Sequence, residues 1–184
     1  MRPRAIALIA AVAALSTAAG AGYYWWSSGV AAEREATRAV SDRLFAARFT
    51  DLQNGAPTLE RWRGQVLVVN FWVTWCAPCR EEIPVFVRMQ RSHGPGGLQF
   101  VGVALDQPAK VAEFAREFRI NYPVVLGGID TMELMREAGN RAGVLPYTLV
   151  IDRQGKVVSR EVGGIKETKL ESLIQPLLSR APPH

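Results

Sequence analysis

The sequence predicts an α/β fold in which helices flank a mixed central sheet. Apolar runs of strand length alternate with segments of helical periodicity along much of the chain, which is typical of parallel strands joined by helices. Two further extended runs follow around a short turn that contains glycine, and these predict an antiparallel hairpin at one side of the sheet. A length of 184 residues, of which 48% are hydrophobic, suffices for one such domain with accessory segments.

The first segment, residues 1–26, has the features of a membrane anchor. Arg2 and Arg4 precede an uncharged stretch from Ala5 to Trp26, which is long enough for a helix that crosses a bilayer and ends in an aromatic cluster typical of a membrane interface. The small residues Ala19-Gly20-Ala21 leave a cleaved signal peptide open as the alternative. Because a positive N-terminus stays in the cytoplasm, we expect a single-pass inner-membrane protein whose remaining chain is periplasmic.

Residues 27–48 predict a juxtamembrane linker helix, because apolar side chains recur at four-residue spacing among charges of both signs. A plain spacer and a helix that dimerises or docks a partner both fit this pattern. The formal net charge of +5 is spread along the chain, without a basic cluster interleaved with aromatic side chains. Nucleic acid is therefore not an expected partner.

The domain expected over 49–184 is built around one buried strand. Turn signals within 49–63 predict an N-terminal hairpin, and the largely apolar run Val66–Trp72 predicts the central strand. An amphipathic helix follows from Cys76, with Pro84 inside it as the expected kink.

The remainder of the domain continues the alternation of strands and helices. We expect strands at 98–105, 122–126, 147–151 and 156–162, with helices capped by Asp106, running from Asp130 to about Gly139, and running over 166–179.

The chain has two cysteines, Cys76 and Cys79, both at the start of the helix that follows the central strand. Unpaired N–H groups and the helix dipole stabilise a thiolate there, so Cys76 is the expected attacking sulfur. Cys79 lies about one turn deeper, where it can act as the resolving thiol that releases a mixed-disulfide partner. Because soft sulfur ligands also suit Cu(I), a copper-binding module or metallochaperone that uses the same cysteines is the alternative. A structural zinc site is disfavoured, because such sites use about four Cys or His ligands.

The segment NFWVTWCAPC at 70–79, followed by Pro84, resembles the active site of the thioredoxin superfamily, and in particular that of its membrane-anchored TlpA/ResA branch. This resemblance implies a thioredoxin fold with a strand–helix insertion near 106–128. It also implies a periplasmic thiol–disulfide oxidoreductase that reduces protein disulfides, such as those of cytochrome c precursors or of copper-site cysteines. Such an enzyme needs a membrane electron donor for its thiol pair and no bound cofactor.

The same resemblance implies roles for residues outside the thiol pair. Pro146 stands where related proteins carry a cis proline that faces the active site, and Leu145 then presents its backbone to an extended substrate segment. Glu82 stands where an acidic residue is held near the thiols and can accept the proton of Cys79; alternatively, it only balances the helix dipole. Trp75 is expected to shield the attacking sulfur and to contribute to the docking surface, or else to belong to the core.

Overall fold

The computed structural model describes the backbone of residues 3–52 and 57–179, and the side chains of these residues except 3–14 and 32–34. The chain divides into two compact units, residues 1–38 and 39–184. Helix α1 (Pro3–Ala46) forms the described part of the first unit and continues into the second. Within the described residues, no helix combines the length and the apolar character that a membrane span needs. The side chains of the first part of the anchor expected over 1–26 lie outside that description.

A six-stranded mixed sheet forms the centre of unit 39–184. Its strand order is β1-β4-β3-β2-β5-β6. Strands β2, β3 and β4 run parallel to one another, β5 is antiparallel to β2, and β6 is antiparallel to β5, which confirms the predicted mixed sheet. The strands are β1 (Thr50–Asp51), β2 (Val66–Trp72), β3 (Leu98–Ala104), β4 (Val124–Leu126), β5 (Tyr147–Ile151) and β6 (Val157–Val162).

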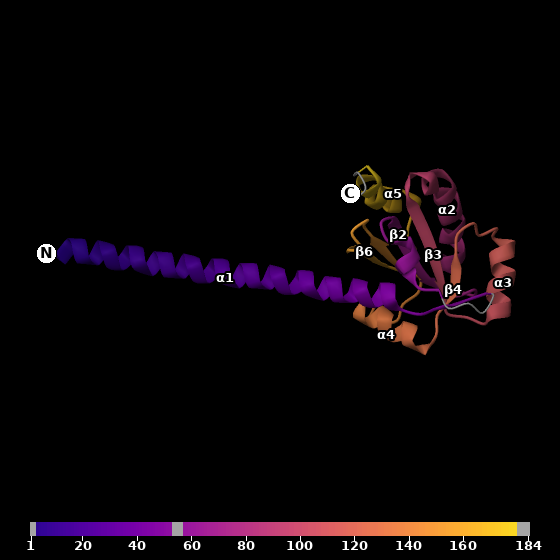
Figure 1. The fold of residues 1–184 in the computed structure, drawn as a ribbon, viewed down its shortest axis with the longest axis horizontal. Coiled ribbons are helices and arrows are strands. Elements are labelled where there is room, and N and C mark those ends of the chain that lie inside the picture. The colour runs from indigo at the N-terminus through magenta and orange to yellow at the C-terminus, as the bar shows by residue number, and fades with distance from the viewer. Residues whose placement is uncertain (1–2, 53–56, 180–184) are drawn as a thin grey trace. The chain divides into compact units, whose positions relative to one another are not determined.

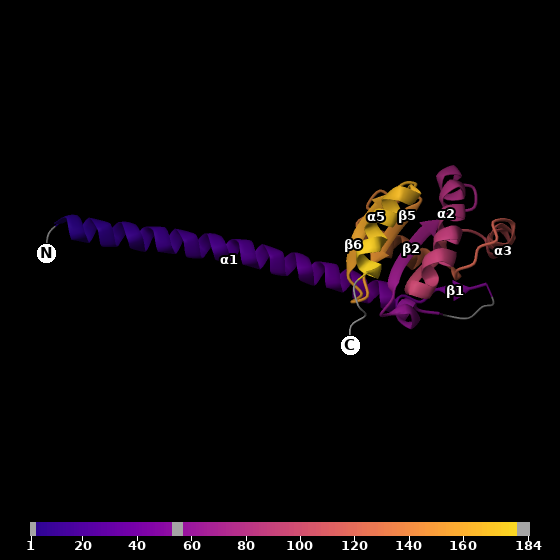
Figure 2. The same ribbon diagram turned by 90° about the horizontal axis from the view of Figure 1, so that it is seen from above.

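Helices cover both faces of this sheet. They are α2 (Ala77–His93), α3 (Pro108–Glu117), α4 (Ile129–Glu137) and α5 (Glu167–Leu178), with short 3-10 helices η1 (Leu59–Trp62) and η2 (Gly94–Gly96). Helices α2 and α5 pack on one face and α4 packs on the other (Figure 1, Figure 2). Helix α3 packs beside the first turns of α2, at the carboxyl ends of β2 and β3. Pro84 lies inside α2 without ending it, as predicted.

The N-terminal hairpin predicted within 49–63 is wrong for the described residues. Strand β1 pairs with β4, and Leu59 and Trp62 lie in a 3-10 helix with both side chains buried. Side chains three positions apart lie on the same side of a 3-10 helix but on opposite faces of a strand. Burial of both Leu59 and Trp62 therefore favours the helical turn. The turn signal Asn54-Gly55 lies outside the described residues.

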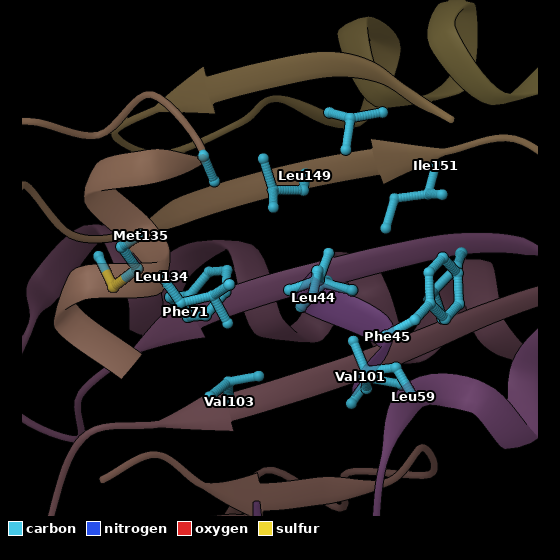
Figure 3. Close-up of a cluster of buried hydrophobic side chains, with 14 of the residues drawn as sticks. Leu44, Phe45, Leu59, Phe71, Val101, Val103, Leu134, Met135, Leu149 and Ile151 are labelled. Atoms are coloured by element: carbon cyan, nitrogen blue, oxygen red, sulfur yellow. The ribbon is translucent and has the colours of Figure 1, made fainter. Parts of the chain in front are cut away.

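The last turn of α1 belongs to the core of unit 39–184. Leu44 and Phe45 are fully buried among side chains from the sheet, η1 and α4 (Figure 3). The Arg63 guanidinium also stacks on the Phe45 ring, 4.0 Å from its centroid. The compact unit begins at Ala39, inside the linker that the sequence predicts over 27–48.

A fragment that begins at Phe49 is therefore expected to be much less stable than one that begins at Ala39. The shorter fragment lacks Leu44 and Phe45, and loss of a large buried side chain typically costs about 2–5 kcal/mol. We expect urea denaturation to show a loss of about 5 kcal/mol or more for the shorter fragment, and Leu44→Ala in the longer fragment to reproduce part of it. Equal unfolding midpoints for both fragments would show that the last turn of α1 does not stabilise the domain.

Candidate active site

Strand β2 delivers two cysteines to the start of α2. Cys76 is the N-cap residue of this helix, and its sulfur accepts a hydrogen bond from the backbone N–H of Cys79 at 3.4 Å. The two sulfurs form a disulfide. The residue Cys76 keeps an exposed fraction of 8%, whereas Cys79 is fully buried. Of the two cysteines, Cys76 is thus the less buried, and the helix start stabilises negative charge on its sulfur after reduction.

A carboxylate from the loop after the neighbouring strand holds the turn that leads into α2. Asp106 lies two residues beyond the end of β3 and accepts hydrogen bonds from the Thr74 backbone N–H, at 3.2 Å, and from the Thr74 hydroxyl. Partial burial raises the pKa of Asp106, but hydrogen bonds from Thr74 and from the Gln107 N–H lower this pKa overall. Helix α3 has Gln107 as its N-cap, so the prediction that Asp106 caps this helix is wrong. The carboxylate is engaged by Thr74 instead.

Arg80 links the same turn to α3. Its guanidinium donates to the Thr74 carbonyl at 3.4 Å and to the Glu117 carboxylate at 3.0 Å. It also lies over the rings of Phe114 and Phe118, at 5.1 and 4.8 Å from their centroids. Sequence reasoning identified neither Arg80 nor Asp106 as part of the site. One signal was available for Asp106: a polar residue that follows a parallel strand lies at the same sheet edge as the end of β2.

Glu82 lies one turn beyond Cys79 with an exposed fraction of only 2%. The Asn70 side-chain amide of β2 donates to Glu82 Oε1 at 2.8 Å and to Thr148 Oγ1 of β5 at 2.9 Å. The backbone N–H of Ile165 donates to Glu82 Oε2 at 3.0 Å. The carboxyl group is therefore fixed in the interior by hydrogen bonds to both of its oxygens.

The same burial changes the acidity of this carboxyl group. Desolvation raises the pKa of Glu82 to about 7, and the hydrogen bonds from Ile165 and Asn70 offset part of that rise. A group with a pKa near the working pH can both accept and return a proton. An exposed glutamate that only balances the helix dipole has neither this burial nor these partners.

The loop before β5 lies against the thiol site. The Leu145–Pro146 peptide bond is cis, as the family resemblance implies. The Pro146 carbonyl accepts a hydrogen bond from the Gly163 N–H at 2.8 Å, and Tyr147 at the start of β5 pairs with Phe71 at the end of β2. Leu145 is partly buried against the apolar cluster that contains both cysteines. The structure thus brings Leu145 and Pro146 to the sheet edge that carries the disulfide.

The Trp75 side chain is 77% exposed, so it lies outside the core. It immediately precedes Cys76, so a partner that reaches this cysteine can also contact the indole ring. In the part of the chain that the structure describes, no group of three or more His, Cys, Asp or Glu side chains is placed to hold a metal ion.

The chain is similar to known proteins in both sequence and fold. The family described as Redoxin matches residues 39–174. The thiol–disulfide oxidoreductase ResA of Geobacillus kaustophilus is 30% identical over 129 residues, which are 70% of this chain and 72% of the relative. ResA of Halalkalibacterium halodurans is 26% identical over 166 residues, 89% of each chain. The structure of a thioredoxin-family thiol:disulfide interchange protein from Chlorobium tepidum TLS matches with a TM-score of 0.65 at 26% identity, over 72% of this chain and 93% of that one. The predicted thioredoxin fold is confirmed.

Proposed function

Since the chain belongs to the Redoxin family and is a thiol–disulfide oxidoreductase, we propose that it reduces disulfides of partner proteins outside the cytoplasm. One observation supports the assignment of roles: Cys76, at a helix N-terminus, keeps an exposed fraction of 8%, while Cys79 is fully buried. The less buried cysteine attacks, and the fully buried one resolves.

The reaction is an exchange of disulfide bonds. The Cys76 thiolate attacks one sulfur of a substrate disulfide, a mixed disulfide forms, and the second substrate sulfur leaves as a thiolate that takes up a proton. The Cys79 thiol then loses its proton and attacks the Cys76 sulfur. The substrate leaves as a dithiol, and the Cys76–Cys79 disulfide seen in the structure remains. A membrane electron donor must supply two electrons and two protons before the next turnover.

Glu82 is the proposed acceptor of the Cys79 proton. Three features support this role: its position one turn further along the same helix, its burial, and a pKa of about 7, raised by desolvation. A carboxylate with this pKa takes the proton at neutral pH and returns it to solvent or substrate afterwards.

Leu145, Pro146 and Trp75 are the proposed contacts for the substrate next to its disulfide. Tyr147 pairs with Phe71 at the end of β2, and the Leu145 backbone two residues earlier is the proposed edge with which an extended substrate segment pairs as an added strand. Trp75 supplies an exposed aromatic surface beside the attacking sulfur. Cytochrome c precursors and copper-site cysteines are the proposed classes of substrate.

We further propose that the uncharged stretch Ala5–Trp26 anchors the domain to the inner membrane from the periplasmic side. The backbone is helical from Pro3 through this stretch, and Arg2 and Arg4 precede it. Alkaline carbonate extraction tests the anchor: the full chain is expected in the membrane pellet, and release into the supernatant would contradict this placement.

Turnover of a protein disulfide tests the proposed activity. The full chain is expected to accelerate the reduction of insulin by dithiothreitol, measured as precipitation of the released chains, with many turnovers per enzyme. A reduced protein that instead binds one Cu(I) tightly, and does not accelerate insulin reduction, would contradict the proposal and favour the copper-binding alternative.

A further inference from the structure

Most of the exposed large apolar side chains in the described part of unit 39–184 lie at one edge of its sheet. The parallel strands β2, β3 and β4 end at this edge, β5 begins there, and β6, which is antiparallel to β5, ends there. Five of the six such side chains lie on segments at this edge, which also carries the disulfide. The five are Trp75, Ile129, Met132, Val144 and Val162, and the sixth is Val158.

Three of these side chains form a surface that we name the α4 shoulder: Ile129, Met132 and Val144. Ile129 and Met132 lie three positions apart on α4 and therefore share one side of that helix. A Cβ atom placed on Gly143 would lie 3.4 Å from the terminal methyl carbon of Met132, so Met132 lies directly beside the residue that precedes Val144. The shoulder thus combines the first turn of α4 with the loop that leads to β5.

The α4 shoulder is not needed to hold α4 on the sheet. The opposite side of the helix is buried through Thr131, Leu134 and Met135. Ile129, in contrast, is 92% exposed at the first position of the helix. A group of neighbouring apolar side chains that stays exposed is typical of a surface that binds another molecule.

Two observations indicate what covers the shoulder. Val144 is followed by Leu145, which packs against the cluster that contains Cys76, so the shoulder is continuous with the thiol site. The charges around it are of both signs and do not favour a charged ligand. Glu133 pairs with Arg136 at 3.6 Å within α4, and both Asp130, next to Ile129 in the chain, and Arg141, three residues before Val144, are exposed.

We propose that the α4 shoulder binds an apolar segment of the same polypeptide whose disulfide is attacked by Cys76. This inference rests on the proposed function, because the occupant is the disulfide substrate itself. A substrate segment that contacts Leu145 reaches Val144 next, and Met132 and Ile129 extend the contact along α4. The shoulder then selects substrates by apolar residues at a distance from their cysteines, whereas Trp75 and Leu145 contact the residues beside the disulfide.

Two synthetic peptides test this selection. Both carry the same cystine and equal net charge; one has leucines and the other has serines at positions several residues away from each cysteine. We expect the full chain to reduce the leucine peptide with a kcat/KM about five- to twentyfold higher, because burial of apolar surface at the shoulder favours it. In the double variant Ile129→Ser/Met132→Ser this preference is expected to fall to about twofold or less.

Val158→Ser is the matched control, since it removes an exposed apolar side chain at the other end of β6, about 13 Å along the strand from Val162. It is expected to keep the preference. Equal kcat/KM values for both peptides with the wild-type chain would overturn the proposal, and so would an unchanged preference in the double variant. A double variant that changes only the sedimentation coefficient would instead identify the shoulder as an interface between copies of the chain, which also overturns it.

Reduction of the small disulfide 5,5′-dithiobis(2-nitrobenzoate) separates this proposal from the proposed function. All three proteins are expected to reduce it at equal rates, because it is too small to reach the shoulder. If the wild-type chain reduces neither this compound nor the peptides, it is the proposed thiol chemistry that fails.

Discussion

Replacing Cys76 with serine is expected to abolish insulin reduction, with a loss of at least about 1,000-fold in turnover. A serine hydroxyl does not ionise near neutral pH and cannot form the mixed disulfide. Cys79 cannot take over the attack, because its side chain is fully buried, whereas the residue Cys76 is 8% exposed. The stabilisation of a thiolate by the start of α2 also acts at the N-cap position, which Cys76 occupies.

Cys79→Ser is the matched variant, since it removes the other sulfur at the same cost in volume. It is expected to keep the first attack and to lose resolution, so that the mixed disulfide between Cys76 and the substrate accumulates. Mass spectrometry of the non-reduced protein after one substrate addition measures this adduct. Substantial turnover by Cys76→Ser, or an adduct that maps to Cys79 in the Cys76→Ser variant, would reverse the two roles.

The Glu82→Gln variant is expected to resolve the mixed disulfide about 100-fold more slowly at pH 8. Glutamine keeps the size of the side chain and cannot accept a proton. In the wild-type chain, the rate of resolution is expected to rise with pH and to level off above about 7, the pKa to which burial raises Glu82. The variant lacks this inflection. Stopped-flow measurement of product release from a preformed mixed disulfide gives both rates.

Glu82→Gln is also expected to change how the free energy of unfolding depends on pH, independently of catalysis. Because the folded-state pKa is raised, the folded domain holds this proton more tightly than the unfolded chain does. The stability that this proton confers is complete below about pH 4.5 and is lost as the pH rises to about 7. The rise in the pKa of Glu82 from 4.5 to about 7 corresponds to about 3 kcal/mol of stability that is lost over this pH range. The Glu82→Gln variant is expected not to show this loss.

Glu81→Gln serves as the control for both measurements, because Glu81 is the exposed neighbour of Glu82 on α2. It is expected to retain the wild-type rate of resolution and the wild-type decline in stability with pH. If Glu82→Gln matches the wild-type chain in resolution at every pH, Glu82 is not the proton acceptor. If only the stability profile changes, the role of Glu82 is confined to the fold.

Local patterns sufficed to predict the central strand, the helix that carries the thiols, and the closing hairpin. The largely apolar run Val66–Trp72 is fully buried as β2, and Pro84 is accommodated within α2. These features depend on hydrophobic periodicity and on residues close together in the chain. The position of Glu82 one turn from Cys79 was likewise readable, because helical spacing places both on one face.

Contacts between distant segments were not predictable in this way. Asn70 and Thr148 are 78 positions apart and meet only through the pairing of β2 with β5. The hydrogen bond from the Thr74 N–H to the Asp106 carboxylate depends on the parallel pairing of β2 with β3. The burial of Leu44 and Phe45 depends on the packing of the last turn of α1 against the sheet, η1 and α4, although their sequence context has the charge pattern of a solvated linker. In each case the contact forms only through the tertiary arrangement of segments that are distant in the sequence.

The reduction potential of the Cys76–Cys79 pair tests most directly whether the pair works in the reducing direction. The full chain is equilibrated with dithiothreitol or glutathione redox buffers, and the fluorescence of Trp75 beside Cys76 reports the fraction reduced. A reductase predicts a reversible two-electron transition with a potential below about −220 mV. A potential near −120 mV would mark the pair as an oxidant and contradict the proposed direction.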